Sequence, residues 1–134
     1  MKQITLVTPA QAGLMADISD HLGQAGINIE TLEAFVVRDW DIVQLTVSDY
    51  NRALVVLRDH GYNAITEDAV VINVKDQPGA LAQVTRRLHA GGVAIRSVRI
   101  LHRQGGEAMV AISMDRTEEG MRLIEDLLVS RSTD

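Results

Sequence analysis

The sequence predicts an α+β fold built from two copies of one β-α-β-β-α unit, the first of which ends with an additional strand. The chain has 134 residues and matches itself at an offset of 66. Residues 12–32, "AGLMADISDHLGQAGINIETL", and residues 78–98, "PGALAQVTRRLHAGGVAIRSV", agree in their glycines and apolar positions. In both copies, segments with an apolar period of two alternate with segments of helical period. We therefore expect one repeat at 1–68 and a second at 69–134.

The first copy contains two predicted helices among its strands. Leu14, Ile18 and Leu22 form an apolar stripe with a spacing of four residues, and Gly26 stands where this helix would end. Alternating apolar and polar residues with many β-branched side chains predict strands. "RDWD" is the turn of a hairpin. The expected elements are strands at 2–8, 27–38, 42–48 and 62–66, and helices at 14–25 and 50–60.

The second copy repeats this order but stops earlier. Leu81, Val84 and Leu88 repeat the helical stripe, which is closed by the double glycine at 91–92. The expected strands lie at 69–75, 93–103 and 108–114, and a second helix is expected at 117–129. No segment after this helix corresponds to "YNAIT", so the second sheet should lack its last strand. Because an open edge invites pairing, we expect a partner chain or the tail to cover the strand at 69–75.

This order of elements is the split βαβ, ferredoxin-like arrangement, in which an antiparallel sheet carries both helices on one face. Proteins of this arrangement have many functions, so the function must be argued from individual sites. An RNA-binding version would present stacking aromatic residues on its central strands, but the four central strands of this chain contain none.

Composition excludes several classes of site. There is no cysteine, which rules out disulfides, thiol nucleophiles and thiolate metal sites. The net charge is −5: residues 1–68 carry 4 basic and 10 acidic side chains, and residues 69–134 carry 9 and 8. Neither half has the basic excess of a nucleic-acid-binding protein. No apolar run approaches a membrane span and no leader precedes "KQITLVT", so we expect an intracellular, cytoplasmic protein without membrane contact.

The turn between the first strand and first helix of the second copy resembles the ACT domain family. "DQPGAL" at 76–81 and "AGGVAI" at 90–95 carry this resemblance, which covers the whole chain as two copies. The first copy keeps "GINIETL", but Ala10 and Ala12 replace the aspartate and the proline. The resemblance implies a regulatory protein of amino-acid metabolism, a homodimer, and a biosynthetic enzyme or regulator as a further partner.

The same turn has physical properties that suit a free amino acid. Pro78 restricts the backbone, and Gly79 lets the backbone come close to a bound group. The first N–H groups of the following helix have no partners within it and can bind a carboxylate. The Asp76 carboxylate could balance the ligand ammonium. The alternative is that Asp76 only caps or stabilises the turn and that Pro78 begins the helix.

The resemblance also implies where a ligand binds. In ACT domains that bind effectors, the ligand lies between this turn and the strand after the first helix of a neighbouring copy. The predicted site therefore combines the complete turn of copy two with the strand of copy one, where Asn28 offers a polar contact. Its residues are Asp76, Gln77, Pro78, Gly79, Ala80, Leu81, Asn28 and Ile29. A weaker reciprocal site would consist of Gln11, Ala12, Gly13, Leu14, Ala94 and Ile95.

Catalysis, cofactor binding and metal binding have no support in the sequence. The histidines do not coincide between the copies, the serines lack a base and an elbow motif, and no glycine-rich loop leads into Lys-Ser or Lys-Thr. Two hypotheses remain. The first is a non-catalytic regulatory protein that binds an amino acid, and the second is a pure interaction subunit with vestigial pockets.

Opposite charges occupy equivalent positions of the strand after the first helix in each copy. Glu30 and Glu33 in the first copy correspond to Arg96 and Arg99 in the second. Like charges directly opposite each other would disfavour pairing of this strand with itself. We therefore expect copy one to pair with copy two, either within one chain or between chains.

Overall fold

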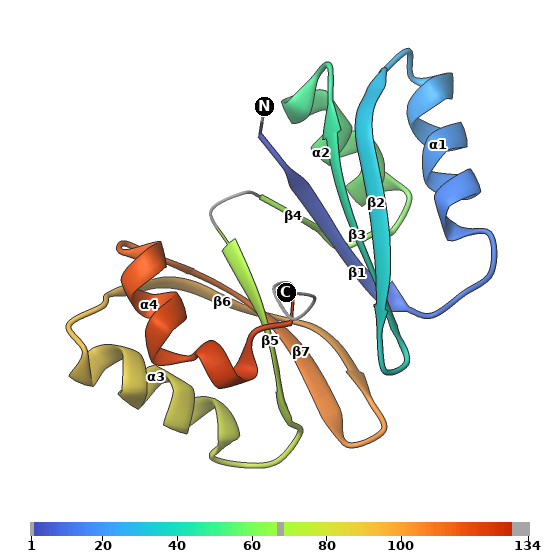
Figure 1. Cartoon of the computed structure of the whole chain (residues 1–134). Coiled ribbons are helices and arrows are strands. Elements are labelled where there is room, and N and C mark those ends of the chain that lie inside the picture. The colour runs from blue at the N-terminus through green and yellow to red at the C-terminus, as the bar shows by residue number, and fades with distance from the viewer. Residues whose placement is uncertain (1, 67–68, 130–134) are drawn as a thin grey trace. The chain divides into compact units, whose positions relative to one another are not determined.

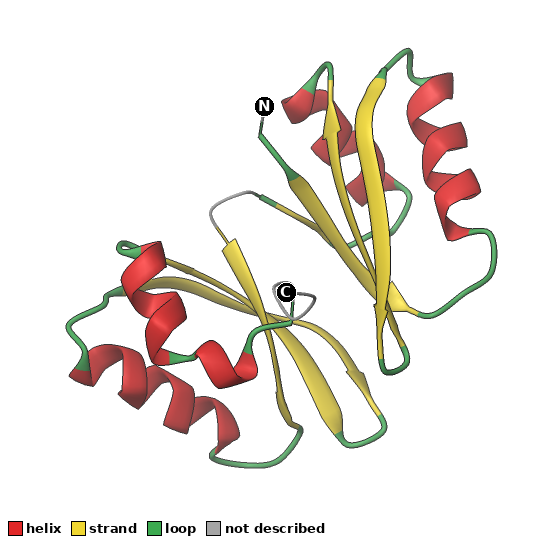
Figure 2. Cartoon of the chain, viewed as in Figure 1, coloured by secondary structure: helices red, strands yellow, loops and turns green. Residues whose placement is uncertain are grey.

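The computed structural model describes residues 2–66 and 69–129, which belong to two compact units, Met1–Glu67 and Asp68–Asp134 (Figure 1). Each unit is an antiparallel sheet with helices, as Figure 2 shows. The predicted α+β class and the ferredoxin-like arrangement of both copies are confirmed.

The first unit has a four-stranded sheet in the order β2-β3-β1-β4. Its residues Leu6 and Thr5 in β1 face Ala64 and Ile65 in β4, so the final short strand pairs with the first. The elements of this unit are β1 (Ile4–Pro9), α1 (Leu14–Gln24), β2 (Ile29–Val37), β3 (Trp40–Val47), α2 (Tyr50–Asp59) and β4 (Ala64–Ile65).

Within residues 69–129, the second unit has a three-stranded sheet in the order β5-β7-β6, and its predicted lack of a fourth strand is confirmed over these residues. β2 in the first unit and β6 here each stand at one edge of their sheet and directly follow the first helix of their unit. The elements are β5 (Ala69–Lys75), α3 (Ala80–Ala90), β6 (Ile95–Gln104), β7 (Glu107–Met114), α4 (Thr117–Leu123) and a 3₁₀ helix, η1 (Glu125–Leu127).

Each core lies between the sheet and the helices of the same unit. In the first unit, Ile18 and Leu22 from α1 pack with alternate residues of β1 and β3 and with α2. In the second unit, Val84 and Leu88 from α3 pack on β5 and β7 in the same way. Leu22 and Leu88 are equivalent at the offset of 66, and both are fully buried. The helical stripe read from the sequence is therefore the face that forms each core.

The end of the described chain occupies the place of the absent strand. Leu128 forms a single antiparallel bridge with Ile72, and the Val129 N–H donates to the Val71 carbonyl at 3.0 Å. This is the register in which β4 pairs with β1 in the first unit. The expectation that the tail covers β5 is thus met over two residues, within the described part of the chain.

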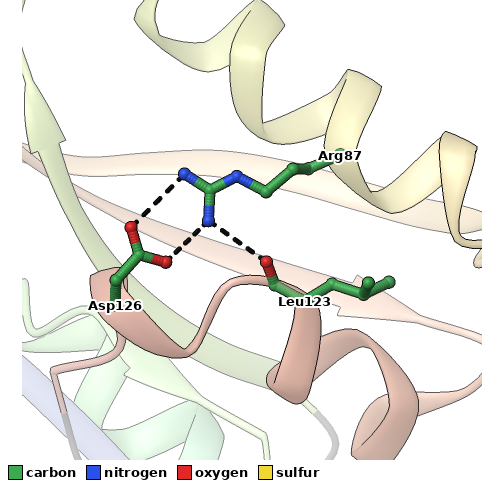
Figure 3. Close-up of polar contacts among 3 residues, drawn as sticks. All are labelled: Arg87, Leu123 and Asp126. Atoms are coloured by element: carbon green, nitrogen blue, oxygen red, sulfur yellow. Dashed lines mark hydrogen bonds and ion pairs between the residues drawn. The ribbon is translucent and has the colours of Figure 1, made fainter.

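The prediction of one helix over 117–129 is wrong. The α-helix α4 ends at Leu123, and Ile124 leaves helical geometry with φ −124° and ψ 27° before η1 begins. Arg87 on α3 forms hydrogen bonds on both sides of this helix end, as Figure 3 shows. Its guanidinium donates to the Leu123 carbonyl at 3.1 Å and to both carboxylate oxygens of Asp126 at 2.6 and 3.3 Å. A terminal helix carbonyl is thereby satisfied from another helix.

We expect Arg87→Ala to lower the free energy of unfolding of the second unit by about 1 kcal/mol, because it removes one ion pair and one carbonyl cap. Both partners are largely exposed, which limits the effect. The hydrogen bond from Arg87 lowers the pKa of Asp126 below its ordinary 3.8. The ion pair therefore contributes its full stabilisation at neutral pH, and this stabilisation is lost as the pH falls below 3.8 and Asp126 becomes protonated. Urea unfolding of the wild-type protein and the Arg87→Ala variant at pH 7 and pH 3 measures this stabilisation. If the two proteins differ in free energy of unfolding by the same amount at both pH values, the ion pair does not make this contribution.

Candidate functional site

The turn at 76–79 joins β5 to α3 and is held by backbone hydrogen bonds. The Asp76 N–H donates to the Gly106 carbonyl at 2.9 Å, and the Gln77 N–H donates to the Lys75 carbonyl at 3.0 Å. Gly79 precedes the helix with a left-handed φ of 89°, a conformation that glycine adopts without strain. The helix thus begins at Ala80, and Pro78 lies before it in the turn.

Three N–H groups at this helix start are free. Within the described residues, the N–H groups of Gly79, Leu81 and Ala82 have no hydrogen-bond acceptor. The Ala80 N–H is already used, since it donates to the Gln77 carbonyl at 3.2 Å. No acidic residue stands in the first turn of α3. The partial positive charge of this helix end is therefore not neutralised by its own side chains.

The Asp76 carboxylate does not cap the helix. The residue before α3 is Gly79, which makes no side-chain cap, and the Asp76 Oδ1 atom instead accepts from Arg103 Nε on β6 at 3.1 Å. The Arg103 side chain is 62% exposed and that of Asp76 is 35% exposed. An ionised carboxylate can accept about four hydrogen bonds, so this ion pair orients Asp76 and leaves it acceptor capacity.

The corresponding turn of the first unit shares one backbone bond with the second and differs in its acids. The Ala10 N–H donates to the Asp39 carbonyl at 2.7 Å, as the Asp76 N–H does to the Gly106 carbonyl, but the Gln11 N–H donates to the Asp41 Oδ2 atom at 3.1 Å. A further acid, Asp17, stands in the first turn of α1. In the second copy, Ala108 occupies the position of Asp41. At the positions of Asp41 and Asp17 the first unit therefore carries carboxylates that the second unit lacks.

The strand residues of the predicted sites lie at the other end of each sheet. Asn28 exchanges hydrogen bonds with Ser48 at 2.9 and 3.1 Å, next to Ile29 at the start of β2. Ala94 exchanges two bonds with Asp115, each of 3.0 Å, next to Ile95. No single unit brings its own turn and its own strand start together. Asn28 and Ile29 belong to a different unit from the turn at 76–81, and their joint contribution stays a prediction.

A sequence profile described as an ACT domain pair matches residues 1–129, nearly the whole chain. The chain belongs to this family. The ACT resemblance carried by "DQPGAL" and "AGGVAI" is thus confirmed. No functionally curated protein matches this ACT domain pair.

Several solved structures are similar to this ACT domain pair. A protein from Bacteroides thetaiotaomicron is 25% identical, with 96% of this chain and 90% of that chain covered and a TM-score of 0.49. The regulatory subunit of aspartate kinase from Thermus thermophilus is 20% identical, with 93% and 91% covered and a TM-score of 0.44. The acetolactate synthase small subunit from Thermotoga maritima is 9% identical, with 96% and 89% covered and a TM-score of 0.41.

Within each ACT unit, a residue near the end of the first helix contacts the segment after the second helix, and the two contacts start from equivalent positions. The sequence analysis did not predict these contacts. His21 at the end of α1 stacks on His60 after α2, with ring centroids 3.8 Å apart, and Tyr62 lies beside them. His21 is equivalent to Arg87 at the offset of 66, and Arg87 likewise contacts the segment after the second helix of its own unit. Burial, with a smaller contribution from Asp17, raises the pKa of Tyr62. The repeat alignment itself was the signal that could have suggested this pairing.

Neither a metal centre nor a membrane-spanning helix is present in the described part of this ACT domain pair. Across residues 2–66 and 69–129, no three histidine, aspartate or glutamate side chains gather where they could hold a metal ion. Over the same ranges, no helix has the length and apolar character needed to cross a membrane.

Proposed function

We propose that this ACT domain pair is a non-catalytic regulatory protein of the cytoplasm that binds a free amino acid at the turn of its second unit. Binding would modulate a metabolic enzyme or regulator, and the protein would act as a homodimer. The observation that carries the proposal is the combination of free N–H groups at the start of α3 with the Asp76 carboxylate a few residues away.

The ligand class follows from the two charges at this turn. Unpaired N–H groups at a helix start attract a carboxylate. The Asp76 carboxylate attracts an ammonium, and Arg103 holds it in place. A molecule that carries both groups on one carbon satisfies both, whereas a simple carboxylate or a simple amine satisfies only one. For a ligand of about ten heavy atoms, affinities on the order of micromolar to millimolar are expected.

The second turn is the stronger site because the first turn of α3 carries no acid and Ala108 stands at the position of Asp41. In the first unit Asp41 accepts from Gln11 and Asp17 lies in the helix start, so a ligand carboxylate would meet two like charges. The residues around the first turn, Gln11, Ala12, Gly13 and Leu14, therefore form the weaker site of this proposal.

The decisive experiment is a thermal-shift screen of the full chain with each of the twenty amino acids, followed by calorimetric titration of those that stabilise it. Each ligand that binds is paired with its amide and its deaminated acid as controls. We expect both controls to bind at least about tenfold more weakly, since each loses one charged hydrogen bond. If no amino acid binds at about 10 mM, roughly ten times the upper end of the expected Kd range, the second hypothesis, a pure interaction subunit, is favoured.

Replacing Gly79 by alanine should lower stability and weaken ligand binding, whereas Gly23→Ala should not. No atom lies within 4 Å of a Cβ placed at either glycine, so neither change creates a clash. Gly79 has φ +89°, where an L-residue is strained by about 1–2 kcal/mol. Gly23 lies in α1 with ordinary helical φ, where alanine is expected to stabilise by about 0.4–1 kcal/mol. Thermal unfolding and titration of both variants measure this, and equal stability changes would contradict it.

A further inference from the structure

We propose that the stacked imidazole rings of His21 and His60 form an acid-sensitive contact between helices α1 and α2 of the first unit. Protonation of both rings changes this contact from attractive to repulsive. The inference goes beyond the proposed function, because it involves the turn of neither unit and does not depend on the amino-acid ligand.

Both histidines stand at the carboxyl end of a helix. His21 lies in the last turn of α1, and His60 is the residue that directly follows α2. Their ring centroids are 3.8 Å apart, and the ring planes are tilted by 30°. The two helices also share an apolar core, to which α1 contributes Leu22 and α2 contributes Leu57. The ring pair therefore adds a polar contact at the helix ends to this shared core.

The His60 ring is held in place in both of its charge states. Its Nδ1 atom lies 2.9 Å from the Val56 carbonyl oxygen, which can only accept, so Nδ1 carries a proton in the neutral ring. Acid adds the second proton at Nε2 and leaves this hydrogen bond intact. His60 thus stays beside His21 when it becomes charged, and the added charge acts on the stack.

The surroundings of the pair allow both rings to become charged in acid. His60 is exposed and His21 is partly exposed, so water reaches both. The carbonyl end of a helix also stabilises a nearby cation. The other charged or titratable side chains within four residues of either histidine are Asp17 and Asp20 on α1, Arg58 and Asp59 on α2, and Tyr62 after it. Carboxylates are the majority of these groups, and Arg58 donates to the Ala64 carbonyl.

The sign of the contact follows from the charge of the two rings. Neutral aromatic rings in contact attract each other. Two unit charges about 4 Å apart repel enough, even in the dielectric of water, to change an equilibrium constant about fivefold. An ordinary histidine changes its charge between about pH 5 and pH 8. The stack should therefore stabilise the first unit at about pH 8 and destabilise it at about pH 5.

The equivalent contact of the second unit responds to acid in a different range. Arg87 occupies the position of His21 and binds Asp126. This ion pair is lost only below pH 3.8, where Asp126 becomes protonated. Acid between about pH 8 and pH 5 should therefore loosen the helix contact of the first unit and leave that of the second unit unchanged.

A double-mutant cycle at two pH values tests the inference. Its four proteins are the wild-type chain, His21→Gln, His60→Gln and the chain with both changes. Trp40 is buried in β3 and is the single tryptophan, so its fluorescence during urea unfolding reports on the first unit. We expect the coupling of the two histidines to raise the folding equilibrium constant at least about twofold at about pH 8. At about pH 5 it should lower this constant about fivefold.

The cycle separates the direct contact between the rings from all other effects of each substitution, including loss of the bond to Val56. His89→Gln is the control, because it removes an exposed histidine from α3 and should leave the pH dependence of the Trp40 signal unchanged. A coupling of the same sign at both pH values would show a structural contact without acid sensitivity. That result, or no coupling at either pH value, would overturn the inference.

Discussion

Leu88→Ala is expected to lower the free energy of unfolding of the second unit by about 3–5 kcal/mol. The side chain is fully buried in α3 among residues of β5, β7 and α4. Its removal loses apolar burial and leaves a cavity that a small core fills only in part. A unit of about 60 residues is marginal on its own, so this loss is comparable to its whole stability. We expect fast amide hydrogen exchange throughout β5 and β7 in this variant.

Two matched variants show whether the effect is specific. Leu22→Ala removes the equivalent side chain of the first unit, which is also fully buried, and should destabilise β1 and β3 instead. Val55→Ala on the exposed side of α2, where the valine is 57% exposed, should change stability by less than about 0.5 kcal/mol. Urea unfolding monitored by hydrogen exchange distinguishes the three. A loss below about 1 kcal/mol for Leu88→Ala would mean that this residue does not belong to a close-packed core.

Asp76→Ala is expected to weaken amino-acid binding at least about tenfold, because a charged hydrogen bond contributes roughly 1.5–3 kcal/mol. Arg103→Ala should have a smaller effect, below about threefold, since an exposed ion pair contributes little and only orients the carboxylate. Calorimetric titration with the amino acid found in the screen measures both.

The control for Asp76 is its counterpart in the first unit. Ala10→Asp should leave binding at the second turn unchanged, because it adds a carboxylate only to the turn where Asp41 already binds the Gln11 N–H. Unchanged affinity in Asp76→Ala and in Asn28→Ala, together with lost binding after substitution of Gly13, would place the site in the first unit instead.

Much of the fold could be predicted because its signals are local. The stripe of Leu14, Ile18 and Leu22 matches the buried face of α1, and β5 has the bounds expected for it. Apolar residues that recur every second residue in a strand, or every three to four residues in a helix, lie on the buried face of that element. The sequence therefore indicates which side chains contact the core. The end of α4 could not be predicted in this way, because it depends on Arg87, which lies 39 residues before Asp126.

The turn before α3 could be located from the sequence, but its hydrogen bonding could not. The order of Asp76, Pro78 and Gly79 before a helical stripe indicated the turn. The partners of its groups depend on residues far along the chain: Arg103 for the Asp76 carboxylate, and Gly106 for the Asp76 N–H. Such pairs arise only when strands that are distant in sequence become neighbours in the sheet.

By itself, the sequence determined the duplication, the order of strands and helices, and the turn that places Asp76, Pro78 and Gly79 before a helix. Periodicity and turn residues encode these features locally. Only the tertiary structure decided which of the two turns receives a carboxylate from a distant strand. β3 brings Asp41 to the Gln11 N–H in the first unit, whereas Ala108 stands in the equivalent place on β7. The physical reason is that a hydrogen bond or an ion pair requires its two groups within about 3 Å, and folding alone sets that distance.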